Sequence, residues 1–184
     1  GTALGDIRTA WTEQRIERVF ATETRPLLQG SRLTAWELSK YGIPFSLISD
    51  SSTGLLLRKG MVHVIFVGAD RIAANGDVAN KIGTYPLAVL AKENGIPFYV
   101  AAPTSTMDMS LRTGDEIPIE ERDATEILEF AGHRTAAVGA NAVNFAFDVT
   151  PNRYVDGIVT EYGVLRNPYR QTIASLMESK SDKA

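Results

Sequence analysis

Cysteine is absent from this sequence of 184 residues, and histidine occurs only twice, as His63 and His133. The absence of cysteine excludes disulfide bonds, thiol nucleophiles and cysteine-ligated zinc or iron-sulfur sites within this chain. The two histidines lie too far apart for a short-spaced histidine metal motif, and we interpret both as structural. We therefore expect no metal site, and any chemistry must depend on carboxylates, amides, lysines and hydroxyls.

Long apolar runs and an excess of one charge are also lacking. No run approaches the about 20 apolar residues that cross a bilayer, and the amino terminus lacks the parts of a signal peptide. We therefore expect a soluble, cytoplasmic protein with no membrane partner. With 19 Lys and Arg against 22 Asp and Glu, the net charge of -3 gives no basic footprint for nucleic acid, although a local pocket for one phosphate is compatible with it. The nucleotide-binding glycine motifs are missing, which weighs against a nucleotide ligand.

Along the chain, segments with the pattern of a β-strand alternate repeatedly with segments that have the pattern of a helix. The apolar run from His63 to Ala69 is typical of a strand covered on both faces, and thus of a parallel sheet. No change in composition marks a second domain. We predict one α/β domain over residues 1–184, with a mostly parallel twisted sheet flanked by helices, Rossmann-like. The expected strands are 18–24, 45–50, 63–69, 98–102, 144–149 and 157–160, and the expected helices are 2–17, 31–41, 52–59, 83–94 and 168–179.

Two joints in the chain share the sequence Gly-Ile-Pro-Phe, beginning at Gly42 and at Gly95. Glycine favours the left-handed position after a helix, and proline forces the preceding isoleucine to be extended. Both joints therefore predict a helix that ends and a strand that begins. Residues 104–133 lack a clean period and carry many charges, so we expect a surface excursion with a short helix near 124–130.

Polar residues follow the expected strands, and in open parallel sheets ligands bind beyond the carboxyl ends of the strands. Asp70 follows the almost wholly apolar strand 63–69, so partial desolvation is expected to raise its pKa and suit it to acid or base catalysis. The alternative is that Asp70 caps a turn or pairs with Arg71. Residues 75–77, Asn-Gly-Asp, predict a tight turn that carries a loop back over the site.

The same loop continues through Asn80 and Lys81 into the helix that starts near Gly83. We expect Lys81, the Asn80 amide and the free backbone amides near Gly83 to form a cradle for a phosphate. Lys81 is otherwise an ordinary surface cation. Gln29 precedes another helix, with Ser31 as its expected N-cap, and would face the same rim.

The segment from Asp50 to Gly54 is compatible with a second anion-binding loop or with an Asx turn and a cap, and the sequence leaves both open.

Taken together, these motifs resemble the methylthioribose-1-phosphate isomerase family, which is related to the regulatory subunits of translation initiation factor 2B. The resemblance covers about residues 1–169 and is specific, because several separate motifs match. The matching motifs are Gly1-Thr-Ala-Leu4, Glu23-Thr-Arg-Pro26, Gln29-Gly-Ser-Arg-Leu33, Gly68-Ala-Asp-Arg-Ile72, Asn75-Gly-Asp77, Asn80-Lys-Ile-Gly-Thr-Tyr85, Pro103-Thr-Ser-Thr106, Glu116-Ile-Pro-Ile-Glu-Glu-Arg122, Asn144 to Pro151 and Asp156-Gly-Ile-Val-Thr-Glu-Tyr-Gly163.

The resemblance implies conversion of 5-methylthioribose 1-phosphate to 5-methylthioribulose 1-phosphate in methionine salvage, without metal or organic cofactor. It implies that Asp70 is the catalytic acid-base residue and that Gln29, Asn80 and Lys81 line the substrate and phosphate site. Because the anomeric carbon carries the phosphate, the sugar cannot open spontaneously, and the enzyme must promote ring opening. Proton transfer through an enediol and a direct hydride shift both remain open.

One departure from the family pattern is at the amino terminus. Family members carry a catalytic cysteine just before the motif with which this chain begins, and a helical amino-terminal domain before that. We therefore expect this chain to be the carboxy-terminal half of a longer enzyme, inactive alone, whose partners are its amino-terminal part and a second copy in a homodimer. The alternatives are a ribose-1,5-bisphosphate isomerase and a non-enzymatic initiation factor 2B-type regulatory subunit.

Overall fold

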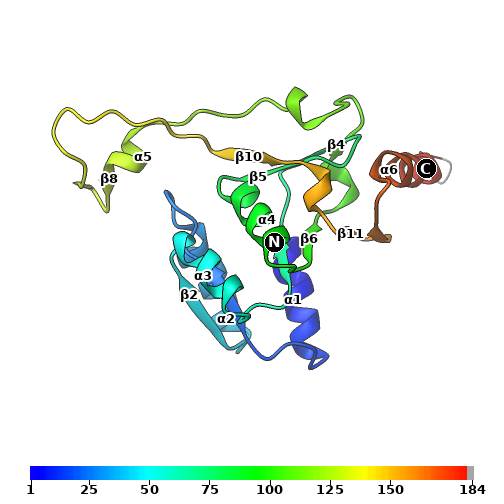
Figure 1. Cartoon of the computed structure of the whole chain (residues 1–184), viewed down its shortest axis with the longest axis horizontal. Helices are drawn as coiled ribbons and strands as arrows, with labels where there is room; N and C mark the ends of the chain where they lie inside the picture. The colour runs from blue at the N-terminus through cyan, green and yellow to red at the C-terminus, as the bar shows by residue number, and fades with distance from the viewer. Residues whose placement is uncertain (182–184) are drawn as a thin grey trace.

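A computed structural model describes residues 1–181 of the chain and shows an α/β fold, as expected (Figure 1). A five-residue π-helical turn, Gly30–Thr34, runs directly into α2. The helices are α1 (Thr2–Thr12), α2 (Ala35–Lys40), α3 (Thr53–Arg58), α4 (Thr84–Glu93), α5 (Thr125–Leu128) and α6 (Tyr169–Ser181). The strands are β1 (Val19–Thr22), β2 (Phe45–Ile48), β3 (Ile65–Val67), β4 (Arg71–Ala73), β5 (Val78–Lys81), β6 (Phe98–Ala101), β7 (Met107–Asp108), β8 (Glu129–Phe130), β9 (His133–Arg134), β10 (Phe147–Thr150), β11 (Gly157–Thr160) and β12 (Gly163–Leu165).

The strands are divided among parallel and mixed sheets. In the order β12-β11-β6-β3, the last three strands are parallel and β12 pairs antiparallel at the edge. A second sheet has the order β10-β5-β4-β7, and β1 and β2 form a separate parallel pair. Because β3, β6 and β11 run in the same direction, the residues that follow them meet at one edge of their sheet.

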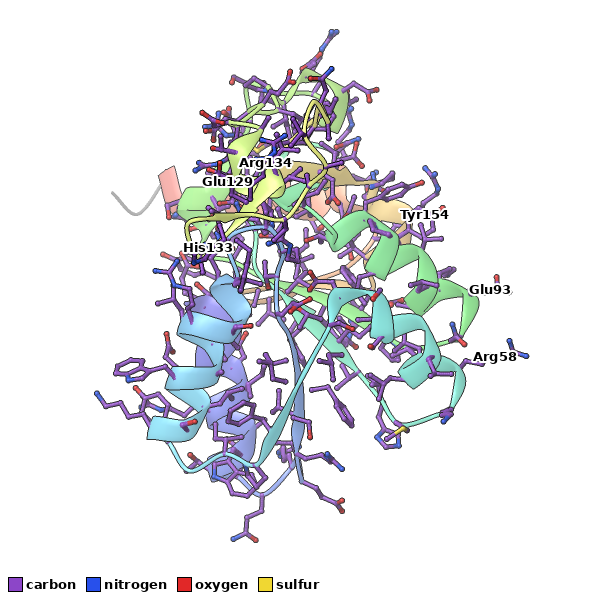
Figure 2. The ribbon with its side chains drawn as sticks, turned by 90° about the vertical axis from the view of Figure 1, so that its left-hand side faces the viewer. Arg58, Glu93, Glu129, His133, Arg134 and Tyr154 are labelled. Atoms are coloured by element: carbon purple, nitrogen blue, oxygen red, sulfur yellow. The ribbon has the colours of Figure 1, made fainter. Side chains whose placement is uncertain are left out.

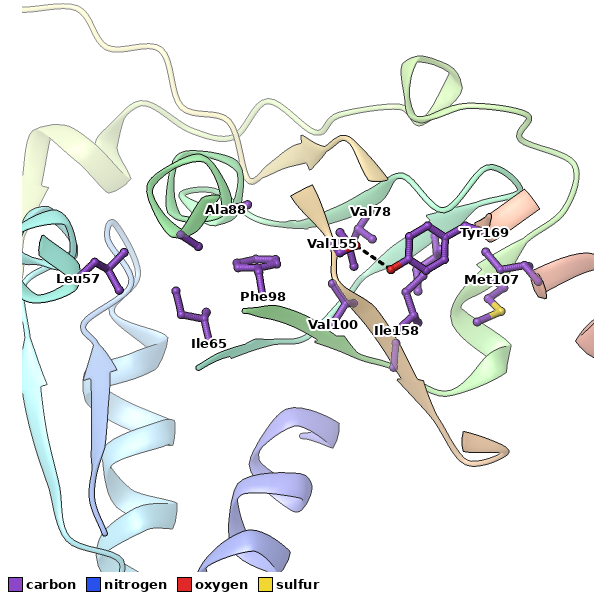
Figure 3. Close-up of a cluster of buried hydrophobic side chains, with 14 residues drawn as sticks. Leu57, Ile65, Val78, Ala88, Phe98, Val100, Met107, Val155, Ile158 and Tyr169 are labelled. Carbon is purple, nitrogen blue, oxygen red and sulfur yellow. Dashed lines mark hydrogen bonds between the residues drawn. The ribbon is translucent and has the colours of Figure 1, made fainter. Parts of the chain in front are cut away.

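The main apolar core lies between these strands and the helices α3, α4 and α6. Figure 3 shows Phe98 of β6 below Ala88 of α4, with Ile65 of β3 beside it. The Tyr169 hydroxyl at the start of α6 donates a hydrogen bond of 2.8 Å to the Val155 carbonyl, and burial raises the pKa of this tyrosine. A smaller cluster around Leu38 joins α1 and α2 to β1 and β2. These two clusters hold the strands in place, and with them the strand ends at which Asp70 and Gln29 were predicted to lie.

The two Gly-Ile-Pro-Phe joints are confirmed. Gly42 and Gly95 have φ angles of +66° and +67° and follow the ends of α2 and α4, and the next residues lead into β2 and β6. The charged excursion is confirmed as well. It is the long segment that reaches away from the sheets in Figure 1, with α5 and the hairpin β8–β9 near its tip.

Surface side chains of this excursion and of the helix ends are seen in Figure 2. Glu129, His133 and Arg134 lie together on the β8–β9 hairpin, whereas Arg58 and Glu93 project outward from the ends of α3 and α4.

Two predicted boundaries were wrong by more than two residues, and one predicted loop was wrong. The helix expected over 2–17 ends at Thr12, because the polar residues after it offer no apolar face and Gln14 takes a left-handed φ of +58°. The strand expected over 144–149 begins only at Phe147, where pairing with β5 starts. The loop expected after Asp70 is the hairpin β4–β5, stabilised by pairing with β7 and β10. That pairing is non-local and leaves no local sequence signal.

Candidate active site

Asp70 lies at the bend between β3 and β4, beyond the carboxyl end of β3, as predicted. Its backbone N–H donates to the Ala79 carbonyl at 2.9 Å, which fixes this bend against β5. The residue as a whole is exposed, but the surrounding protein still desolvates the carboxyl and raises its pKa, while the positive charge of Lys81 opposes that rise. The Arg71 guanidinium binds Asp108 at 3.0 Å, so the alternative pairing with Asp70 is not observed. The Asp70 carboxyl therefore lies at this rim with a raised pKa.

The turn predicted at residues 75–77 joins β4 to β5. The Gly76 N–H donates to the Ala73 carbonyl at 2.9 Å, and Gly76 has a φ of +86° that favours glycine. The Asp77 carboxylate accepts hydrogen bonds from the backbone of Gly114 and from the backbone and side chain of Asn152, at 2.8 to 3.0 Å. The turn is thus fastened from two sides, and its role is to hold the hairpin rather than to cover the site.

Asn80 and Lys81 end β5, opposite two residues of β10. Lys81 pairs in register with Phe147, and Asn80 with Asp148. The Asn80 amide donates to the Thr84 hydroxyl at 2.9 Å, while the Lys81 ammonium lies 4.3 Å from the centre of the Phe147 ring. Successive residues of a strand point to opposite faces, so the Asn80 and Lys81 side chains lie on opposite faces of β5.

The backbone amides at the start of α4 are not free, which corrects one expectation. The Asp148 carboxylate accepts hydrogen bonds from the backbone N–H groups of Gly83, at 2.7 Å, and Tyr85, at 3.0 Å. Burial raises the pKa of Asp148, and these backbone hydrogen bonds oppose that rise. A carboxylate of the chain itself therefore occupies the anion position of this helix. Of the predicted phosphate cradle, the Lys81 ammonium is the part that this carboxylate does not occupy.

Gln29 faces the same side of the rim as Lys81. The two side chains line one small pocket, together with Pro26, Leu27, Arg122, Glu126, Asn144 and Ala146. The Gln29 Oε1 atom is buried and has no hydrogen-bond partner among residues 1–181. Gly30 is required next to it, because any Cβ at this position would overlap the Thr22 carbonyl. Ser31, the expected N-cap, lies inside the π-helical turn instead.

The segment from Asp50 to Gly54 is linked by hydrogen bonds to the residues that follow β1. The Asp50 carboxylate accepts hydrogen bonds from the backbone N–H groups of Thr24, at 2.8 Å, and Arg25, at 2.7 Å. The Thr53 hydroxyl donates to the Asp50 carbonyl at 2.9 Å. The Asx turn and cap that the sequence left open are not observed, because the Asp50 carboxylate binds amides of another segment and the two short helices that begin here have no side-chain cap. The anion-binding alternative stays a prediction.

The structure thus brings Gln29 and Lys81 into one pocket and places Asp70 within electrostatic reach of Lys81. Asn80 does not line that pocket. Sequence reasoning missed the contacts of Phe147 and Asp148, because they depend on the long-range pairing of β10 with β5, which has no local signal in the sequence. Within the described residues, no three His, Cys, Asp or Glu side chains form a group that could hold a metal. None of the helices over residues 1–181 is both long and apolar enough for a membrane span.

An α/β fold with polar side chains at the carboxyl ends of its parallel strands is typical of the class of domains whose ligand sites lie at that edge of the sheet. Within that class, the chain belongs to the initiation factor 2 subunit family, whose model matches residues 1–167. The family predicted from the motifs is thereby confirmed.

Among curated relatives, the chain is 59% identical to the methylthioribose-1-phosphate isomerase of Geotalea uraniireducens over 177 residues, which are 96% of this chain and 51% of that protein. It is 56% identical to the 5-deoxyribose 1-phosphate isomerase of Moorella thermoacetica, covering 98% of this chain and 52% of that protein. The chain therefore spans about half the length of these relatives.

Two solved structures share the fold closely. One is 5-methylthioribose 1-phosphate isomerase from Pyrococcus horikoshii, with a TM-score of 0.95 and 47% identity over 97% of this chain and 50% of that one. The other is the delta subunit of translation initiation factor eIF-2B from A. fulgidus, with a TM-score of 0.91 and 48% identity over 97% of this chain and 52% of that one. The fold alone thus does not separate an isomerase from an initiation-factor subunit.

Proposed function

We propose that this chain carries the acid-base residue and part of the phosphate site of an aldose-ketose isomerase that converts 5-methylthioribose 1-phosphate to 5-methylthioribulose 1-phosphate. The observation that supports this most is the position of Asp70 beyond the end of β3, with Lys81 at the end of β5 close enough to lower its pKa. The pKa of Asp70 is raised by burial, and the Lys81 ammonium lies within its electrostatic reach. The names of the curated relatives agree with this chemistry.

In this proposal each side chain has one role. Lys81 binds the phosphate on C1, Gln29 offers its unpaired amide oxygen to a sugar hydroxyl, and Asn80 orients the loop through Thr84. Asp70 donates a proton to the ring oxygen as the bond from that oxygen to C1 breaks. Hydrogen then moves from C2 to C1, and the C2 hydroxyl returns a proton to Asp70 as the ketone forms. No proton is gained or lost overall, whether the hydrogen moves as a hydride or through an enediol.

The direct test is an assay of the protein as encoded, that is, of the complete product of its gene. This material is chosen because the relatives are about twice as long as this chain. With 5-methylthioribose 1-phosphate as substrate, we expect a C2 ketone to appear in the carbon NMR spectrum without added metal or cofactor. An unchanged sugar under the same conditions would favour a non-enzymatic role, such as that of an initiation-factor subunit like the A. fulgidus protein. The homodimer implied by the resemblance and the cytoplasmic location expected from the sequence remain part of this proposal, and sedimentation of the protein tests the former.

A second candidate substrate is 5-deoxyribose 1-phosphate, which the name of the Moorella thermoacetica relative favours. The two sugars share the C1 phosphate and the ring, and differ only at C5. The roles of Asp70 and Lys81 are the same for both. Selection between them must therefore come from contacts with the C5 substituent.

The proposal makes a prediction for the pH dependence of catalysis. Burial raises the pKa of Asp70 and Lys81 lowers it, so Lys81→Met removes only the opposing effect. In the profile of kcat/KM against pH, which reports the free enzyme, the limb that reports Asp70 is expected to move to higher pH in this variant. Lys59→Met, an exposed lysine after α3, serves as the matched control and should leave the limb in place. A shift to lower pH would contradict the assignment.

A further inference from the structure

Phe147 of β10 is in contact with the cation of the candidate phosphate site. It stands opposite Lys81 in the antiparallel pairing of β10 with β5, so both side chains lie on the same face of the sheet. The Lys81 ammonium lies 4.3 Å from the centre of the Phe147 ring, well within the range of a cation–π interaction. An aromatic ring thus holds a flexible lysine at its charged end.

Of the two cations that line the pocket, Lys81 is the one whose charge is not neutralised by a carboxylate of the described residues. The other cation lining the pocket, Arg122, is paired with Glu126 and with Glu120. Lys81 forms no ion pair within residues 1–181, and it rests on the ring instead. A cation over a ring keeps its charge available to an anion, whereas a cation bound to a carboxylate is already neutralised.

We propose that Phe147 is a positioning residue of this site, whose ring holds the Lys81 ammonium at the place where the sugar phosphate binds. This inference rests on the proposed role of Lys81 as the phosphate ligand. A lysine side chain has four rotatable bonds, and confining its ammonium before binding reduces the conformational entropy lost when the phosphate arrives. Phe147 therefore acts on substrate affinity through Lys81, without touching the substrate.

The test is a double-mutant cycle on the protein as encoded, with inorganic phosphate as the binding probe and the sugar phosphate as substrate. Phe147→Leu is expected to weaken phosphate binding and raise KM by about fivefold, and to change kcat by less than about twofold. Phe147→Tyr keeps the ring and should stay within about twofold of the parent. In a Lys81→Met background, Phe147→Leu should have no further effect on either quantity.

Phe145→Leu is the matched control, because Phe145 lies two residues earlier in the same segment and is 46% exposed. It should leave KM unchanged. If Phe147→Leu fails to fold, Phe147→Met removes the ring with a different apolar side chain and is measured in its place. Equal weakening by Phe147→Leu with and without Lys81 would overturn this inference while leaving Lys81 as the phosphate ligand. If Lys81→Met itself does not weaken phosphate binding, both the inference and the assignment of Lys81 fail.

Discussion

Asp70→Asn in the protein as encoded is expected to lower kcat for the isomerisation by about 10³-fold. Asparagine has nearly the same shape as aspartate, but it can neither donate a proton to the ring oxygen nor accept one from the C2 hydroxyl. KM is expected to stay within about threefold of the parent value, because Lys81 and Gln29 bind the sugar phosphate independently of this proton. Steady-state measurement of both constants at several pH values checks the prediction.

The control for this variant is Asp115→Asn, which changes an exposed carboxyl in a short turn on the charged excursion. It should leave both constants unchanged. A kcat of Asp70→Asn within about threefold of the parent would exclude Asp70 as the acid-base residue. A large rise in KM with unchanged kcat would instead indicate that Asp70 binds the substrate without exchanging a proton.

The second large effect is expected on stability, from Asp77→Ala. The Asp77 carboxylate accepts hydrogen bonds from Asn75, Gly114 and Asn152, at 2.8 to 3.0 Å, and so links the β4–β5 turn to two distant segments. Removing it leaves several partly buried donors without an acceptor, which costs about 3 kcal/mol. For a domain of this size the melting temperature should fall by roughly 9 °C.

Calorimetry of the protein as encoded measures this fall. Asp115→Ala again provides the control, since surface substitutions usually change stability by less than about 0.5 kcal/mol. Asp77→Asn is informative as well, because its amide nitrogen would face backbone N–H groups that need an acceptor, so a clear loss of stability is expected there too. A melting temperature of Asp77→Ala within about 2 °C of the parent would show that the turn does not depend on this carboxylate.

What could be predicted from the sequence is what the chain determines locally. The glycines at 42 and 95 end helices because glycine readily adopts a positive φ. Asp70 directly follows the apolar residues that form β3, so its position at the end of that strand could be predicted from adjacent residues. The order of Asn80 and Lys81 after the turn was also visible. These features depend on short-range patterns. The structure confirms the helix ends at Gly42 and Gly95 and the position of Asp70 after β3, whereas Asn80 and Lys81 lie on strand β5 and not in a loop.

The parts that escaped prediction depend on contacts between distant positions. Asp148 lies 65 positions from Gly83, so its occupation of the helix amides has no local signal, and the free amides that the sequence suggested were wrong for this reason. The ring of Phe147 is likewise brought to Lys81 only by the pairing of β10 with β5. Strand register across a sheet is fixed by packing, which a single sequence does not reveal.

The most direct test of the account is a comparison of kcat/KM for three sugars with the protein as encoded: 5-methylthioribose 1-phosphate, 5-deoxyribose 1-phosphate and ribose 1,5-bisphosphate. The account predicts turnover of a sugar with one phosphate, on C1, with the highest kcat/KM for the methylthio compound and little turnover of the bisphosphate. This preference is expected because, within residues 1–181, Lys81 is the cation of the candidate pocket that has no carboxylate partner, while Arg122 is held by Glu126. A higher kcat/KM for ribose 1,5-bisphosphate, or no turnover of any of the three sugars, would contradict it.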